Sequence, residues 1–364
     1  MEYIRGLRSG IEADGRAWQI TTVVGSVLLG AMLICSSGMA AQSARFEVGL
    51  VGDLPYTPED EQKFPNLMRA LNAAHLAFVV HMGDIEPDAR AYAYFKTGTE
   101  PCTDQTLQAR KALFDTSSHP FILTPGDNDW TDCRYAVPAF DPLERLARLR
   151  DIFFAGDRSL GNHTLVLRRQ SADPGFAGYR ENTLWRQGGV LFLTLDMVGS
   201  NNNLGYDAAN DAEFAERTRA NLAWIERAFD QARREGDRGL MILTQANPGF
   251  ETRGSAPSAP AAATPSAAPG PTPFGEVLDA LERETLAFGK PVVFVHGDTH
   301  YFRVDKPLLG TKSGRTIENF TRVEVFGSPN VHWVRAIVDP DDPGVFTFRP
   351  ELVPANGVDH LHVK

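Results

Sequence analysis

The feature that most constrains the fold is an apolar segment followed at once by a glycine and an aspartate, and this pattern occurs three times. The pairs are Gly52-Asp53, Gly83-Asp84 and Gly126-Asp127, each placed after a short apolar run: 46–51, 77–82 and 120–124. Near-continuous apolar runs of this length are typical of strands buried on both faces of a sheet. Ligands of open α/β sheets bind beyond the carboxyl ends of the strands, so the three carboxylates are expected to converge.

A single aspartate after a strand is usually only a helix cap. Here the three acids are joined by a fourth strand-end motif, His296-Gly297-Asp298-Thr299-His300, after the apolar run 291–295. Clustered carboxylates need a nearby positive charge to coexist, and divalent metal ions provide it. The pattern therefore predicts a metal site at the carboxyl edge of the sheet.

Further periodic segments complete an α/β pattern. Apolar strands are expected at 190–195 and 239–243, helices at 66–75, 106–114, 212–235 and 274–288, and half-exposed strands of shorter alternation at 322–326 and 345–348. Strands that alternate with helical segments favour two packed sheets flanked by helices. The C-terminal strands are expected to complete the second sheet.

Composition narrows the class of protein. The chain has 364 residues, 43% of them hydrophobic and 23% charged, which is ordinary for a globular domain and excludes a multi-span membrane protein. The net charge of −10 disfavours a general nucleic-acid partner, because phosphate backbones attract basic surfaces. We expect one domain at 45–350.

The N-terminus has the form of an export signal. Arg5, Arg8 and Arg16 precede an uncharged stretch at 19–43, and small residues surround Ala40. This predicts a signal peptide at 1–40 and a periplasmic or secreted protein. The alternative is an uncleaved membrane anchor, which would be the only contact with a membrane.

Two other segments interrupt the domain pattern. The stretch 254–273 is rich in Pro, Ala and Ser and has too little apolar bulk to form a core, so it is expected to be a flexible insertion. The residues 351–364 form a C-terminal tail, and the histidines at 360 and 362 are expected to be solvated there.

The cysteines support the export prediction. Only Cys102 and Cys133 remain after cleavage at Ala40, and an even pair in an oxidising compartment favours a disulfide. Two unpaired thiols are the alternative. Zinc binding is disfavoured, since neither cysteine belongs to a CxxC pair.

The order of the motifs resembles that of the calcineurin-like metallophosphoesterases, whose pattern runs DxH, GDxx, GNH[DE], a later His and GHxH. The resemblance spans about 45–304 and implies an α/β/β/α sandwich, two sheets with helices outside. It implies two divalent metal ions and a ligand set drawn from seven residues: Asp53, Tyr56, Asp84, Asp127, Gln245, Asp298 and His300.

The chain departs from the family pattern at several histidines. Pro55 stands at the histidine of DxH, although Tyr56 matches the DxxY version of the purple acid phosphatase branch. Asn128 stands at the catalytic histidine of GNH[DE], Gln245 at the later histidine and Asp298 at the first histidine of GHxH. Oxygen ligands in place of imidazoles suit Mg²⁺, Mn²⁺ or Ca²⁺ better than Zn²⁺ or iron. An alternative is that only the first metal remains.

The resemblance implies hydrolysis of a phosphomonoester or phosphodiester by a metal-bound hydroxide. The candidates for catalytic roles are Asn128, Asp129 and His296, with leaving-group protonation falling to water, Asp129 or His296. Loss of a general acid lowers rates by about 10² to 10⁴. The alternative function is therefore a catalytically weak or inactive protein that binds a metal or phosphoester on the same scaffold.

Three other motifs have simpler interpretations. Gly161-Asn162-His163 looks like GNH but lies far beyond the third strand, so we interpret it as a chance match. His81, inside an apolar strand, is expected to be a hydrogen-bonded core residue. The donor-rich run 199–203 suits phosphate binding, but turn chemistry explains it equally well.

Overall fold

The computed structural model describes residues 45–95, 98–250 and 272–357. The predicted signal peptide lies outside the described residues, as do most of the Pro/Ala-rich insertion and the last seven residues of the predicted tail. The described residues belong to one compact unit. Within them, no helix combines the length and apolar character needed to cross a membrane.

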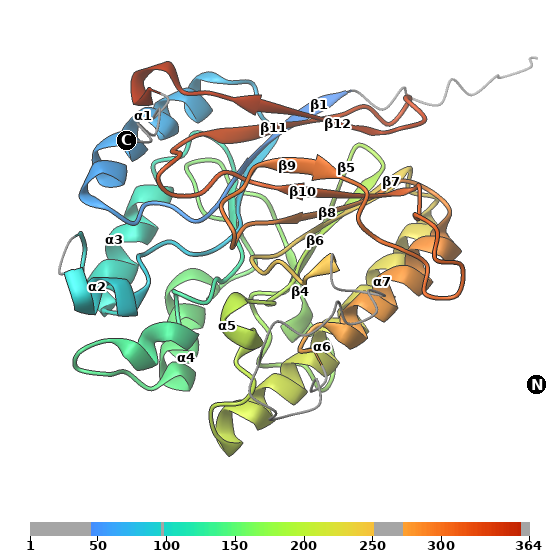
Figure 1. The fold of residues 1–364 in the computed structure, drawn as a ribbon. Helices are drawn as coiled ribbons and strands as arrows, with labels where there is room; N and C mark the ends of the chain where they lie inside the picture. Colours follow the sequence, from blue (N-terminus) through green and yellow to red (C-terminus); the bar gives the residue numbers. More distant parts are fainter. Residues whose placement is uncertain (1–44, 96–97, 251–271, 358–364) are drawn as a thin grey trace, which may run out of the picture. The chain divides into compact units, whose positions relative to one another are not determined.

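One sheet has five strands and carries the first three acid motifs (Figure 1). Its strand order is β12-β11-β1-β2-β3. Strands β1, β2 and β3 are parallel to one another, and β11 and β12 join antiparallel on the other side of β1. The strands are β1 (Phe46–Val51), β2 (Phe78–His81), β3 (Phe121–Leu123), β11 (Trp333–Val338) and β12 (Phe346–Glu351). Because β1, β2 and β3 are parallel, the loops that follow them leave the sheet at the same edge.

The second sheet has seven strands in the order β4-β5-β6-β7-β8-β10-β9. The middle strands β6, β7, β8 and β10 are parallel, and antiparallel strands close both edges. The strands are β4 (Arg168–Arg169), β5 (Thr183–Gln187), β6 (Val190–Thr194), β7 (Gly239–Leu243), β8 (Val292–His296), β9 (Arg303–Asp305) and β10 (Phe320–Glu324). The parallel strands again bring their carboxyl ends to one edge.

The helices cover the outer faces of the two sheets. The elements are α1 (Pro58–Ala73), α2 (Ala89–Phe95), α3 (Asp104–Phe114), α4 (Pro142–Phe153), α5 (Gly199–Asn202), α6 (Ala208–Glu235) and α7 (Gly275–Phe288), with shorter 3₁₀ turns at Thr131–Tyr135, Gln170–Ala172 and Pro354–Asn356. Local signals fix their ends. Thr57 and Asp60 form a capping box at the start of α1, and Gly236 ends α6 in a left-handed conformation.

Three apolar layers hold the fold together. The layer between the sheets contains Val48 and Val80 from one sheet and Phe192 and Val293 from the other, all buried. A second layer packs α1, α3 and α4 on the five-stranded sheet, and a third packs α6 and α7 on the seven-stranded sheet. The predicted class, an α/β fold of two sheets flanked by helices, is confirmed.

The predicted destination of the C-terminal strands is wrong in part. β10 does complete the second sheet, and it pairs parallel to β8. β12, however, pairs with β11, and β11 pairs with β1 in the first sheet. Alternation along a strand reports which face is buried but not which sheet receives the strand. Helix α6 also begins at Ala208, four residues before the predicted start, because Asp207 caps it.

Candidate metal centre

The predicted acids do meet at the carboxyl ends of the strands. Asp53 follows β1 and Asp84 follows β2, and Asp298 approaches them from the end of β8 in the other sheet: its backbone amide donates to Asp53 Oδ1 at 2.9 Å. Asp53, Asp84, Asp298 and His300 all have positive φ, between 54° and 76°. Left-handed backbone at non-glycine residues is uncommon and gathers at functional sites.

Two glycines of the motifs permit this close approach. A Cβ at Gly126 would lie 2.0 Å from Asp84 Oδ1, and a Cβ at Gly297 would lie 2.1 Å from Asp53 Oδ2. Real Cβ atoms do not reach such distances from other heavy atoms, so only glycine fits at these two positions. The glycines therefore let backbone pack directly against the carboxylates.

Four predicted ligands form one group at the end of β1. The Tyr56 hydroxyl donates to Asp84 Oδ2 at 2.9 Å, and His300 Nε2 lies 3.7 Å from Asp53 Oδ1. Asp53 is fully buried, and among the described residues its Oδ2 has no hydrogen-bond partner. A buried carboxylate oxygen without a donor is unfavourable unless a cation binds it. The unpartnered Asp53 oxygen therefore favours a cation at this position.

The orientation of His300 suits metal binding. Its Nδ1 lies 2.8 Å from the carbonyl oxygen of Ser328. A carbonyl only accepts, so Nδ1 carries the hydrogen and the lone pair is left on Nε2, the atom that faces Asp53. Burial lowers the pKa of His300, which keeps the ring neutral. A neutral imidazole held by a backbone carbonyl is the usual form of a metal-binding histidine.

The carboxylates crowd one another electrostatically. Burial raises the pKa of Asp53 and of Asp84 well above the ordinary value, and the neighbouring acids raise both further. Burial and the charge of Asp298 raise the pKa of Asp127 to about 6. Each of these shifts means that the ionised form is disfavoured in the protein alone. A bound cation would reverse that preference.

Of the other three predicted ligands, Asp127 and Asp298 lie with Asp84 around the side-chain amide of the third, Gln245. Gln245 Nε2 lies 2.8 Å from Asp127 Oδ1, 3.2 Å from Asp84 Oδ2 and 3.4 Å from Asp298 Oδ1. The sequence predicts an oxygen of Gln245 as a metal ligand here. In the structure the oxygen of this side chain faces the backbone amide of Gly199 at 2.7 Å instead, so the side chain presents its N–H groups to the acids.

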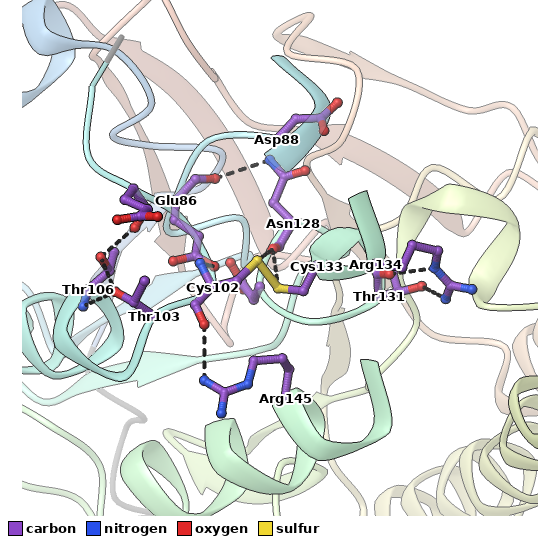
Figure 2. Close-up of a disulfide and its surroundings, with 12 residues drawn as sticks. Glu86, Asp88, Cys102, Thr103, Thr106, Asn128, Thr131, Cys133, Arg134 and Arg145 are labelled. Carbon is purple, nitrogen blue, oxygen red and sulfur yellow. Dashed lines mark hydrogen bonds between the residues drawn. A yellow bond between two sulfur atoms is a disulfide. The ribbon is translucent and has the colours of Figure 1, made fainter. Parts of the chain in front are cut away.

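The candidate catalytic residues Asn128 and Asp129 are engaged in hydrogen bonds to backbone. Asn128 Nδ2 donates to the Glu86 carbonyl at 3.1 Å (Figure 2). The Asp129 carboxylate accepts from the backbone amides of Gly126, Asp84 and Ile85 at 2.8, 3.1 and 2.8 Å. Burial raises the pKa of Asp129 to about 7. The contacts of both side chains favour a bracing role for this loop.

His296, the third catalytic candidate, is fully buried at the end of β8. Its Nδ1 lies 2.8 Å from the Gly297 carbonyl, and its Nε2 lies 4.0 Å from a carboxylate oxygen of Glu324. Glu324 also accepts from the backbone amide of Tyr301 at 2.9 Å. This placement favours support of the loop that carries Asp298 and His300 over contact with a substrate.

A disulfide braces the loop after β3, as the sequence predicts. Cys102 and Cys133 are joined by an S–S bond of 2.01 Å. Both sulfurs lie against the carbonyl oxygen of Asn128, at 3.9 and 3.6 Å (Figure 2). Glu86 lies close to both sulfurs and accepts from the Cys102 amide at 2.8 Å. Sulfurs in a disulfide offer no thiolate, so this trio does not form a second metal site.

Asp127, Asp84 and Asp298 around the Gln245 amide form the second half of the site, and the group around Asp53 forms the first half. A left-handed turn covers the second half. The element α5 contains Ser200, Asn201 and Asn202 with φ of 44°, 56° and 51°, and Asn203 continues with 66°. Runs of left-handed L-residues are strained by about 1–2 kcal/mol per residue. The buried Arg217 holds the turn by donating to the side chain and the carbonyl of Asn202 at 2.6 and 3.0 Å.

Three further residues shape the site: the sequence does not single out Ser328 or Asp60 as site residues, and it marks Gly199 only as part of the donor-rich run 199–203. Gly199 holds the oxygen of Gln245, and Ser328 holds His300 through its carbonyl and Asp60 through its hydroxyl at 2.7 Å. Asp60 is visible in the sequence only as part of a helix cap. The motif-like His163 is exposed and contacts the Ser118 carbonyl at 2.7 Å, whereas the buried His81 contacts the Leu54 carbonyl at 3.1 Å.

Comparison with known proteins places the fold. No family model matches the chain, and no curated protein matches it. The solved structure of PhoD is similar with a TM-score of 0.51 at 14% identity, over 85% of this chain and 70% of PhoD. A 5'-nucleotidase from Candida albicans matches with a TM-score of 0.41 at 10% identity, over 84% of this chain and 50% of that one. The likeness to PhoD shows the fold alone, an α/β arrangement of two sheets flanked by helices.

Proposed function

We propose that this chain is a metal-dependent hydrolase of a small phosphomonoester or phosphodiester. One observation carries the proposal: carboxylates that follow two parallel strands of the five-stranded sheet meet a tyrosine hydroxyl and a neutral histidine from a loop of the seven-stranded sheet. The group contains Asp53, Asp84, Tyr56 and His300, and an oxygen of Asp53 has no partner among the described residues. The phosphoesterase-type fold supports the same chemistry at the level of architecture.

Each residue of this group would have a distinct role in binding the cation or in orienting its ligands. Asp53, Asp84, Tyr56 and His300 would hold the cation, and Ser328 would keep His300 in its metal-binding tautomer. A bound divalent cation supplies a Lewis acid for the phosphoryl oxygens. The left-handed backbone at Asp53 and Asp84 fixes both carboxylates before any ligand arrives.

The surroundings of Asn128 and Asp129 support a proposal about the preferred substrates. Asn128 has no titratable proton, and Asp129 is held by three backbone amides. Leaving-group protonation is then left to solvent, which lowers rates most for poor leaving groups. We therefore propose a preference for esters of acidic alcohols, such as aryl phosphates and aryl phosphodiesters, over alkyl phosphates.

Hydrolysis assays test the proposal. Purified protein, residues 41–364, is assayed with p-nitrophenyl phosphate, bis(p-nitrophenyl) phosphate and an alkyl phosphate, each with Mg²⁺, Mn²⁺, Ca²⁺ or Zn²⁺. Turnover should require a divalent ion, decline from aryl to alkyl esters, and disappear in Asp84→Asn. Asp341→Asn is the matched control, since Asp341 is exposed in the β11–β12 turn at the other end of the sheet. Absence of turnover with every metal and ester would disprove the proposal.

A second candidate function is cation or phosphoester binding without turnover. It is favoured by the contact between Asn128 and the Glu86 carbonyl, because this side chain stands where the resemblance places a catalytic histidine. Binding of a divalent ion and of inorganic phosphate with no hydrolysis would select this function. Fast hydrolysis of either aryl ester would eliminate it.

We also propose that the protein is exported and works in the periplasm or outside the cell. The disulfide between Cys102 and Cys133 supports this, since such bonds persist in oxidising compartments. Fractionation of cells that express the full chain, with mass spectrometry of the mature N-terminus, tests it. Cleavage near Ala40 is the expected result, and an intact N-terminus in the membrane fraction would indicate an anchor.

A further inference from the structure

The orientation of the Gln245 side chain is fixed by its neighbours. Its Oε1 receives the backbone N–H of Gly199 at 2.7 Å. If the amide were turned over, two donors would face each other at Gly199, and an oxygen would face the carboxylates of Asp127 and Asp84. Both contacts would be repulsive, so the N–H groups must point at the acids.

The neighbouring amide oxygen is engaged as well. Asn247 Oδ1 accepts the Gly249 N–H at 3.1 Å, and the backbone N–H of Asn247 donates to Asp298 Oδ2 at 3.1 Å. The two amide side chains that follow β7 therefore direct their oxygens to backbone donors. Neither is turned toward the carboxylates as an oxygen ligand.

Gln245 Nε2 occupies a central position among three acids. Asp127, Asp84 and Asp298 each place an oxygen within 3.4 Å of this nitrogen. A cation bound by the same three carboxylates would need that space, because cation–oxygen distances are about 2.0–2.6 Å for Mg²⁺ and Ca²⁺. Gly199 also closes this side of the site, since a Cβ there would lie 2.7 Å from oxygens of Asp127 and Asp298.

Asp84 belongs to both groups, but the surroundings of Asp53 differ from those of the acids around Gln245. Asp53 Oδ2 has no donor among the described residues, and His300 directs an unprotonated nitrogen toward this carboxylate. Within the described part of the chain, no side-chain amide donates to either Asp53 oxygen, and Oδ1 accepts the backbone amide hydrogen of Asp298 at 2.9 Å. One half of the site is thus arranged for a cation and the other half for an amide.

We infer that this chain binds a single divalent cation, held by Asp53, Asp84, Tyr56 and His300, and that the Gln245 amide takes the place of a second one. The inference deepens the proposed function and rests on its cation site, but it does not depend on hydrolysis. The amide donates hydrogen bonds to Asp127, Asp84 and Asp298, the acids that a second cation would otherwise bind. Substitution of this one side chain by a metal ligand should then restore the second cation.

Metal stoichiometry tests the inference directly. The protein is stripped with a chelator, loaded with Mn²⁺, desalted and analysed for manganese per chain. The wild type should hold one Mn²⁺ and give the electron paramagnetic resonance spectrum of an isolated ion. Two tightly bound ions per chain, or a spectrum of exchange-coupled ions, would overturn the inference. A chain that holds no Mn²⁺ at all would overturn it equally.

The variant Gln245→His adds a second test. It removes the amide donor and supplies an imidazole, so the expected result is two Mn²⁺ per chain with exchange coupling. Gln187→His at the far end of β5 is the matched control and should still bind one Mn²⁺ per chain. If Gln245→His does not fold, as judged by circular dichroism, Gln245→Glu provides an oxygen ligand of similar length with the same expectation. A folded variant that still binds one ion would contradict the role given to the amide.

The two proposals fail in different ways. One Mn²⁺ per wild-type chain without hydrolysis of any ester would leave the inference standing and remove the proposed function. Two ions per wild-type chain with rapid hydrolysis would overturn the inference and support the proposed function.

Discussion

The Asp129 carboxylate accepts the backbone amide hydrogen of Asp84 at 3.1 Å, so an acid from the third strand end holds the turn at the second. The same carboxylate accepts from Ile85 and from Gly126. Asp129 is fully buried. Its contacts are thus all to backbone groups that set the position of Asp84.

Asp129→Ala is expected to destabilise the protein by about 3 kcal/mol or more, because buried N–H groups left without an acceptor are penalised by about 1–3 kcal/mol each. Asp129→Asn keeps one acceptor oxygen and should be destabilised less. Urea unfolding of the metal-free protein measures both, with Asp341→Asn as an exposed control expected to change little. An unchanged unfolding midpoint in Asp129→Ala would exclude the bracing role.

Gly199→Ala should disturb the second half of the site without touching the first. Its new Cβ would lie 2.7 Å from Asp127 Oδ2 and from Asp298 Oδ1, so the turn must shift and weaken the bond from Gly199 to Gln245. Overpacking of this kind destabilises by about 1–3 kcal/mol. Gly178→Ala is the matched control, since nothing lies within 4 Å of a Cβ there. Thermal unfolding of the pair measures the difference, and equal midpoints would contradict the contact.

Reduction of the disulfide should destabilise the protein and loosen the Asn128 loop. The two cysteines are 31 residues apart, and a loop of that size is stabilised by about 3–4 kcal/mol in the chain-entropy model. Thermal unfolding with and without a phosphine reductant measures the effect. The double variant Cys102→Ser with Cys133→Ser should start at the lower midpoint and no longer respond to the reductant. A response in that variant would mean that the reductant acts elsewhere.

His81 predicts a pH dependence of stability. Burial lowers the pKa of His81 from 6.5 to about 3, so the unfolded chain binds a proton that the native one does not. Stability from this residue is complete above pH 6.5 and is lost as the pH falls, by about 2 kcal/mol at pH 5. His81→Leu removes that loss but also the contact to Leu54. The wild type should therefore lose stability relative to His81→Leu between pH 7.5 and 5 in urea unfolding. A constant difference would refute the shift.

The convergence of Asp53, Asp84, Asp298 and His300 could be predicted because each motif is local and parallel strands end at a common edge. The orientation of Gln245 could not, since it depends on the amide of Gly199, 46 residues away along the chain. The amino-acid types at 199–203 also do not reveal that Gly199 leads into a left-handed turn. The two-sheet class followed from periodicity, whereas the pairing of β11 with β1 required knowledge of long-range partners.

That pairing has a consequence for the order of events during biosynthesis. β1, which positions Asp53, lies between β2 and β11 in the sheet. β11 begins at residue 333, so it is synthesised long after β1 and β2. Ser328, which sets the tautomer of His300, is also made late in the chain. The strand that bears the first ligand therefore stays an open edge until residues 333–338 have been made, and the centre can close only after that point.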